Sequence, residues 1–531
     1  MSTNDLTVKL SVKTMSRAAL GCIISIYLLA GFLAVRNLAT WHTRITYPGE
    51  ESYEGCALAE MARLGQGVPI YAPPSDQGFA GATYGPLYYL TGSHLVNPYD
   101  PSYRPIRLLS ALAILGCAVG CGLLTFWATR KRLAAFLSPL VFLSYGIVTF
   151  HGVSALSDSV ALLFFFSAFL IAYRFRNSRA ILLATPLMCL GFYYKPQYIA
   201  GPLAVMVFLF IEKQYSRFVQ FIGGLALFGF GFLGFFQWIA FPGQEFWRHF
   251  FLYQATLMSW HQFKIGLLVF LLIFGVPILL AFEYLRLRPD RLLGCYLVCA
   301  VALGIATIGK ETAFIQYFFE SIIMVSVLVP ALLAERIARG PAPYEVTMLL
   351  AIALFAGQWY TPPAPTPRAF AQYAAVESYL SANFPPGARA IGFRGGDLVQ
   401  AGMNTPFSDL FQTELLAKRG VVSDRHLIDQ IRAGWFSVIV LDFDLEKETD
   451  PIWLNYYLTP AVREAIGREY HPVQVLQVPE PERLWPQDRF YIYVPRSGGQ
   501  SDGNGKSQSL NFPFAHLPPL VSHEVSIDSV R

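Results

Sequence analysis

Charged residues are scarce in this chain, and their scarcity excludes an ordinary soluble fold. Only 14% of the 531 residues are Asp, Glu, Lys or Arg, while 54% are hydrophobic, and the mean hydropathy is +0.42. Soluble domains carry roughly 25% charged residues, so most of this chain is expected to lie in lipid. The net charge of +5 is modest, and no nucleic acid partner is expected.

Nucleotide-binding and cysteine motifs are missing as well. The sequence has no Walker loop, no GxGxxG after a strand pattern and no fixed-period repeat, which argues against an ATP-driven pump or a Rossmann domain. Six of the seven cysteines fall inside apolar runs, and Cys56 stands alone outside them. Neither a disulfide framework nor a CxxC metal site is therefore expected.

Long apolar runs are abundant. About eleven approach the ~20 residues that span a bilayer core. They cover about residues 18–36, 106–128, 134–151, 155–173, 180–197, 199–212, 218–240, 264–282, 291–308, 315–334 and 344–358. The first run is too long for a signal sequence and predicts an uncleaved anchor. We expect a polytopic α-helical membrane protein with about eleven transmembrane helices.

Lys and Arg cluster in every second connection between these runs. The clusters are Lys9, Lys13 and Arg17; Arg130, Lys131 and Arg132; Arg174, Arg176 and Arg179; Lys213 and Arg217; Arg286, Arg288 and Arg291; and Arg336 and Arg339. The positive-inside rule then places the N-terminus in the cytoplasm and the first large loop outside. With an odd number of spans, the C-terminus is outside too.

The amino-acid composition changes after Tyr360, where the apolar runs end and a Pro-rich linker begins. Ordinary soluble alternation follows it and predicts a small α/β domain, with helices near 369–382 and 424–433 and strands near 389–393, 436–442 and 490–494. The expected divisions are a cytoplasmic tail at 1–17, a membrane module at 18–358 with an outer loop at 37–105, a linker at 359–367, an outer α/β domain at 368–496 and a disordered tail at 497–531.

The first outer loop is acidic and rich in Pro and Tyr. It sets Glu50, Glu51 and Glu54 at a membrane surface. A carboxylate whose pKa is raised by partial burial can take the proton of a weak nucleophile. A solvated loop charge or an acid at a helix N-terminus is the alternative.

Other ionisable residues gather near the same surface. These are Asp158, Lys195, Lys310, Glu311 and Glu320. Because charges in membrane helices are costly, their shared side predicts a cavity that opens outward, although each could instead reach the nearest interface alone. His151 and His249 lie there too, as metal ligands or as ordinary polar residues at helix ends.

Four segments together resemble bacterial family 39 glycosyltransferases of the GT-C superfamily, which are related to protein mannosyltransferases and lipid A aminoarabinose transferases. The segments are PGEESYEG with LAEMARLGQGVPIYAPPSD and YGPLYYL, then HGVSALSDSVALLFFF, FYYKPQYIAGP and QYFFESIIM. The resemblance covers roughly residues 18–358. LLAKRGVVSDRHLIDQIRAGWFSVIVLD is a weaker match beyond it.

The resemblance implies an inverting sugar transfer from a polyprenyl-phosphate carrier, with a first-loop carboxylate as general base and often a divalent metal. Counting back from the Gln-Gly and Pro-x-Tyr landmarks favours Glu54, which is our first choice. Counting from Pro48 favours Glu50 or Glu51, and the three stay open.

The remaining roles follow from the same resemblance. Lys195 is expected to bind the carrier phosphate with help from Arg104 and Arg107. Asp158 either holds Mg²⁺ or Mn²⁺ or orients Lys195. Tyr84, Tyr88, Tyr89, Gln316 and Glu320 are expected to support the site. Thr83 to Pro86 replace the Glu-Lys-Pro of the aminoarabinose transferases, which weakens the case for that substrate and for a metal ligand there.

The sequence therefore predicts a multi-pass glycosyltransferase of a bacterial cytoplasmic membrane. Its expected partners are a polyprenyl-phosphate-linked sugar donor, membrane lipid, and a lipid, glycan or protein acceptor. A transporter or flippase of a lipid-linked saccharide is an alternative, although transporters usually place charges near the bilayer midplane. A non-catalytic protein of envelope polysaccharide assembly is another, and only the outer domain supports it.

Overall fold

A computed structural model of the chain describes residues 17–51, 54–253, 258–310, 315–339, 343–359, 361–445, 458–477 and 489–496. Apart from Arg17, the expected tails at 1–17 and 497–531 lie outside the described residues, and so does Glu311.

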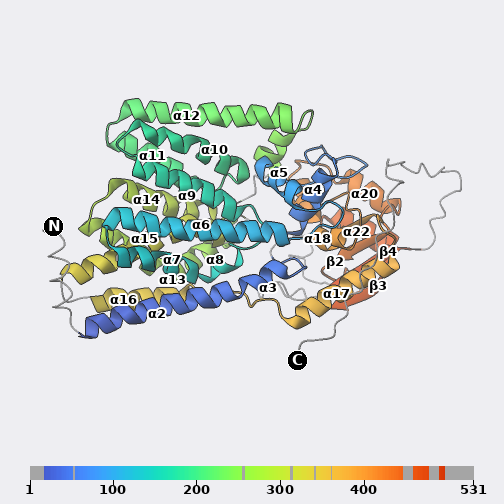
Figure 1. Ribbon diagram of the computed structural model, residues 1–531. Coiled ribbons are helices and arrows are strands. Elements are labelled where there is room, and N and C mark those ends of the chain that lie inside the picture. Colours follow the sequence, from blue (N-terminus) through green and yellow to red (C-terminus); the bar gives the residue numbers. More distant parts are fainter. Residues whose placement is uncertain are drawn as a thin grey trace.

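Long helices lie side by side and form one bundle (Figure 1). They are α2 (Arg17–Ala39), α6 (Arg104–Thr129), α7 (Arg132–Ser144), α9 (Asp158–Arg174), α10 (Ala184–Tyr194), α11 (Ala200–Ile211), α12 (Tyr215–Gly234), α13 (Trp260–Leu287), α14 (Arg291–Thr307), α15 (Phe319–Arg339) and α16 (Pro343–Ala356). Among the residues described, five helical stretches are long and apolar enough to cross a membrane: Leu20–Thr46, Arg104–Thr129, Tyr215–Ala240, Trp260–Leu287 and Ile315–Ala338. The chain is a polytopic helical membrane protein, and the number eleven stays a prediction.

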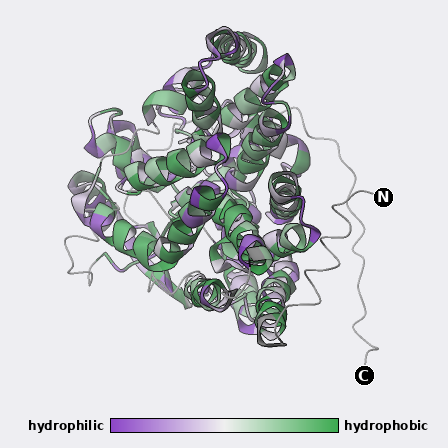
Figure 2. Ribbon diagram, turned by 90° about the vertical axis from the view of Figure 1, so that its left-hand side faces the viewer, coloured by the Kyte–Doolittle hydropathy of each residue, from purple (hydrophilic) through white to green (hydrophobic). Residues whose placement is uncertain are grey.

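Viewed along the bundle, most helices carry hydrophobic residues around much of their circumference (Figure 2). Outward-facing apolar side chains such as Leu28, Leu227 and Leu279 are each more than two-thirds exposed. Exposing so many apolar side chains to water would be unfavourable, whereas exposing them to lipid tails carries no such cost.

Three of the expected spans end or break at the end of the bundle that carries the first loop. The expected helix at 134–151 stops at Tyr145, where Gly146 N–H bonds to Gly357 O at 3.0 Å, and the short α8 (Gly146–Phe150) follows. The expected helix at 155–173 begins only at Asp158. The expected helix at 180–197 ends at Tyr194, because Pro196 disfavours helical geometry at the residue before it.

The first loop folds over this end of the bundle as three short helices. These are α3 (Trp41–Thr46), α4 (Gly55–Gly65) and α5 (Pro86–Leu95). Short 3-10 and π segments complete the bundle, η1 (Arg179–Leu183), η2 (Phe235–Ala240), η3 (Arg248–Tyr253) and η4 (Ile315–Phe318).

Beyond the bundle, α17 to β4 form what we call the C-terminal α/β unit. Its elements are α17 (Pro367–Asn383), β1 (Ala390–Gly392), α18 (Gly395–Gln400), α19 (Leu410–Lys418), α20 (Arg425–Arg432), β2 (Val438–Leu441), α22 (Pro460–Glu469), β3 (Tyr470–Gln477) and β4 (Arg489–Pro495). The sheet order is β1-β2-β4-β3, with only β1 and β2 parallel. The unit lies against the end of the bundle that carries the first loop (Figure 1).

Candidate active site

Glu54, the first choice from the sequence, lies fully buried beside Arg107 of α6. Arg107 donates to both carboxylate oxygens, from Nε at 3.1 Å and from Nη2. The main-chain N–H groups of Ala155 and Glu51 donate to the same two oxygens, the latter at 3.2 Å. A carboxylate has about four lone-pair positions. All four of Glu54 are therefore in use.

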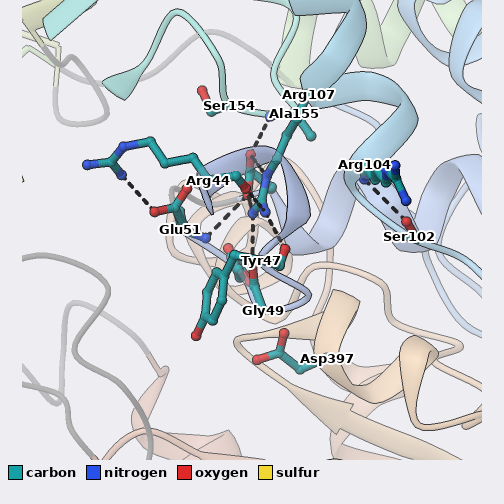
Figure 3. Close-up of polar contacts among 12 residues, drawn as sticks. Arg44, Tyr47, Gly49, Glu51, Ser102, Arg104, Arg107, Ser154, Ala155 and Asp397 are labelled. Carbon is teal, nitrogen blue, oxygen red and sulfur yellow. Dashed lines mark hydrogen bonds and ion pairs between the residues drawn. The ribbon is translucent and has the colours of Figure 1, made fainter. Parts of the chain in front are cut away.

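Arg107 ties this ion pair to the end of α3. Its guanidinium also donates to the carbonyl oxygens of Arg44, Tyr47 and Gly49, at 2.9, 2.6 and 2.8 Å. These hydrogen bonds of Arg107 all go to residues of the first loop. They therefore do not support the expected role of Arg107 in binding the donor phosphate. Arg104 is exposed and points away from this group (Figure 3).

Glu51 faces the other side of the loop. Its Oε1 accepts from Arg44 Nη1 at 2.7 Å, and its Oε2 accepts no hydrogen bond from the described residues. Burial raises the pKa of the Glu51 carboxyl above its usual value, while Arg44 and Arg107 oppose that shift. Glu51 is therefore a buried, oriented carboxylate with one oxygen available for a proton.

Glu50 faces the C-terminal α/β unit. Burial raises its pKa to about 8, and the Arg394 guanidinium, 3.9 Å from Oε2, opposes the shift. The Asp397 carboxylate raises it further.

Lys195 and Asp158 meet at the ends of α10 and α9. Lys195 Nζ donates to both oxygens of Asp158 at 2.8 Å, and Tyr198 OH donates to Asp158 Oδ1 at 2.5 Å. An ammonium has three N–H donors, so one is left over among the described contacts of Lys195. Asp158 thus orients Lys195, one of the two roles expected for it.

The turn between α8 and α9 joins the Glu54 and Lys195 groups. Its Ala155 N–H binds Glu54, and three residues later Asp158 binds Lys195. His151 opens the turn and lies within electrostatic range of Arg44, Asp158 and Lys195. The expected convergence of distant helices at one end is therefore present, whereas a shared cavity stays a prediction.

The expected tyrosines line the same junction. Tyr84 places its ring 5.6 Å from Lys195 Nζ, and Tyr88 OH donates to Ala155 O at 2.7 Å. Tyr89 OH donates to Glu60 at 2.5 Å. Glu60 was not predicted. It also accepts from Ala82 N–H and Ser408 Oγ, and burial raises its pKa to about 7.

Glu320 and Gln316 lie deeper, near the start of α15. Glu320 accepts from the N–H groups of Ala200 and Gly201 and from Tyr296 OH at 3.1 to 3.3 Å, so it caps the start of α11. Gln316 O accepts from Tyr198 OH at 3.4 Å. His249 packs apart from both groups, against Tyr71, Phe79 and Tyr253.

A divalent metal does not fit the residues at Asp158. Both of its oxygens already face the Lys195 ammonium. Within the part of the chain that the structure describes, no group of three or more His, Cys, Asp or Glu side chains could hold a metal ion.

Comparison with known proteins identifies the fold. No family model matches the chain, and no curated protein sequence matches it. Among solved structures, ArnT from Cupriavidus metallidurans bound to undecaprenyl phosphate is 11% identical, covers 88% of this chain and 98% of that chain, and has a TM-score of 0.56. Its apo form is 10% identical, covers 87% and 97%, and has a TM-score of 0.54. The chain therefore shares the fold of these two ArnT structures.

Proposed function

We propose that this protein is an integral membrane glycosyltransferase that moves a sugar from a polyprenyl-phosphate carrier to a lipid, glycan or protein acceptor. The observation that carries the proposal is that the turn between α8 and α9 connects two buried groups of charged side chains. One group contains the ion pairs Glu51–Arg44 and Glu54–Arg107, and the other is the ion pair Lys195–Asp158. The ArnT structure of the same fold contains undecaprenyl phosphate, which supports a carrier of that kind.

Glu51 is the general base in this proposal. Glu54 has no lone pair to spare, and Glu50 faces the C-terminal α/β unit. Glu51 lies beside Arg44, whose guanidinium carbon is 5.0 Å from the Phe150 ring centroid. Phe150 adjoins His151, which lies within range of Lys195. This chain of contacts connects Glu51 with the proposed phosphate site, and it supports Glu51 over Glu50, whose neighbour Arg394 belongs to the C-terminal α/β unit.

The proposed reaction is a single displacement at the anomeric carbon of the sugar. Glu51 takes the proton of the acceptor hydroxyl or amine, and the acceptor atom forms a bond to the anomeric carbon as the bond to the carrier phosphate breaks. The electron pair leaves with the polyprenyl phosphate, whose charge the third N–H of Lys195 stabilises. A single displacement inverts the anomeric carbon.

The proposed setting is a bacterial cytoplasmic membrane with the N-terminus inside and both the first loop and the C-terminal α/β unit outside. The basic connections support this orientation. A transporter or flippase has less support, because the Glu51–Arg44, Glu54–Arg107 and Lys195–Asp158 pairs lie at the end of the bundle that carries the first loop instead of near its middle.

Mass spectrometry of cell-envelope glycolipids and glycans, with and without the gene product, tests the proposal and names the sugar. A glycan that loses one sugar in the deletion strain and regains it only with a Glu51-containing copy supports the enzyme. An unchanged envelope, or full restoration by the Glu51→Gln variant, contradicts the proposal.

A further inference from the structure

The turn between β1 and α18 of the C-terminal α/β unit grips the main chain of the first loop at Glu50. Arg394 Nη2 donates to Glu50 O at 3.1 Å. Arg394 Nε lies 3.1 Å from Asp397 Oδ2. Asp397 thus orients the guanidinium that holds the carbonyl of Glu50, the peptide group that leads into Glu51.

The two segments touch backbone to backbone at this point. A Cβ added to Gly55 would lie 2.8 Å from Gly396 N, and one added to Gly396 would lie 2.6 Å from Gly55 Cα. Real Cβ atoms do not approach so closely, so neither glycine can be replaced without separating the segments. The contact is therefore fixed in register and cannot slide.

The charges at this contact are buried and out of balance. Arg394 faces the carboxyl groups of Glu50, Asp397 and Asp442, and one oxygen of each has no hydrogen-bond partner among the described residues. Burial raises the pKa of Asp442 to about 6 and that of Glu50 to about 8. So much uncompensated polarity is costly.

We propose that Arg394 and Asp397 are positioning residues for sugar transfer: Asp397 orients Arg394, which clamps the Glu50 carbonyl and so aims the Glu51 carboxylate. The inference rests on the proposed function, and it makes the C-terminal α/β unit part of the active site. Arg44 holds the Glu51 carboxylate from one side, and the clamp fixes the peptide that carries it. A misplacement of about 1 Å can cost on the order of a hundredfold in rate.

The test compares Arg394→Lys and Arg394→Gln with a matched control, Arg389→Gln. Arg389 is exposed on the same unit, where its guanidinium stacks 4.3 Å from the Trp435 ring. Lys keeps the charge but not the fork that reaches both partners. The purified full-length protein is assayed for transfer from undecaprenyl-phosphate-linked sugars, with kcat and donor KM measured separately.

We expect both Arg394 variants to lower kcat at least about tenfold while the donor KM stays within about twofold, because aim is lost and carrier binding is not. Asp397→Asn, which keeps an acceptor oxygen for Arg394 Nε, should retain more kcat than Asp397→Ala. Arg389→Gln should match the wild type. If Arg394→Gln does not fold, Arg394→Lys decides alone.

Wild-type kcat in Arg394→Lys, or equal losses in Asp397→Asn and Asp397→Ala, would overturn the clamp. A loss confined to KM would also overturn it. An inactive wild-type protein contradicts the proposed function instead, so the two failures are distinguishable.

Discussion

Replacement of Glu54 by Gln should damage the fold more than the chemistry. The carboxylate accepts two hydrogen bonds from Arg107 and two from main-chain N–H groups. Gln keeps one acceptor oxygen and turns an NH₂ group toward the other two donors. The variant therefore loses two of the four hydrogen bonds and leaves the Arg107 guanidinium, which is 0% exposed, without a counter-charge.

The size of the effect follows from that geometry. Removal of one partner from a buried ion pair costs about 3–5 kcal/mol. Arg107 keeps three carbonyl acceptors, which places the expected loss near the lower end of that range. Glu51→Gln is the natural comparison. It also removes the counter-charge of a buried guanidinium, Arg44, but its remaining oxygen can still accept from Arg44, so a smaller loss than that of Glu54→Gln is expected.

Unfolding of the purified variants in detergent micelles measures the difference. A cycle of Glu54→Gln, Arg107→Gln and the double variant should give a coupling energy of about 0.5–3 kcal/mol. Glu464→Gln, on the exposed surface of α22, controls for the Glu to Gln change itself.

The reasoning fails if Glu54→Gln unfolds within about 0.5 kcal/mol of the wild type. It also fails if Glu54→Gln is stable and inactive while Glu51→Gln transfers sugar normally. That second result would return the general base to Glu54, the residue that the sequence favours first.

Lys195→Ala should reduce transfer about a hundredfold or more, while Lys264→Ala, an exposed lysine of α13, should leave it unchanged; equal rates for the two variants would exclude a phosphate role. Glu50 has a higher pKa in the folded than in the unfolded state, so the stability it contributes at acidic pH is lost as the pH rises from about 4.5 to about 8. Thermal unfolding of Glu50→Gln should accordingly vary less with pH over that interval, and parallel curves would contradict the burial. Tyr198→Phe removes a hydrogen bond from Asp158 and should lower transfer by about tenfold or less, measured as kcat/KM. A reporter fused at Pro365 should be active only outside the cytoplasm, and a cytoplasmic signal would reverse the orientation.

The membrane character and the end of the bundle that carries the site could be predicted from the sequence. Alternating basic connections and apolar runs follow directly from the cost of placing charge in lipid. They place Asp158 and Lys195 at one end, where the structure pairs them. Pro196 marks the end of α10 just before Lys195, although the predicted span runs past it.

The partners of the loop carboxylates could not be predicted in the same way. Glu54 and Arg107 lie 53 positions apart, and Glu50 and Arg394 lie 344 apart. Nothing in the local sequence says which buried guanidinium will reach which acid. One signal was available, since Arg44 is a basic residue in a loop that the positive-inside rule predicts to be poor in Lys and Arg. An arginine at such a position suggests a specific partner, and in the structure that partner is Glu51.

In the C-terminal α/β unit, too, some elements could be predicted from the sequence and others could not. The alternating pattern predicts α17, α20, β1, β2 and β4 close to where they lie, but β3, α18, α19 and α22 were not predicted. The strand β3 begins directly at the end of α22 and contains Pro472. A proline inside a run weakens a strand prediction, but β3 is an edge strand whose register with β4 shifts between Pro472 and Gln474, and proline is tolerated there.

Direct transfer by the purified protein tests the central claim. Wild type, Glu51→Gln, Lys195→Ala and Glu464→Gln are each reconstituted in liposomes with a panel of undecaprenyl-phosphate-linked sugars and an envelope acceptor extract. We expect the wild type and Glu464→Gln to release undecaprenyl phosphate and glycosylated product in equal amounts, while Glu51→Gln and Lys195→Ala release neither. Release by Glu51→Gln at the wild-type rate would contradict the account.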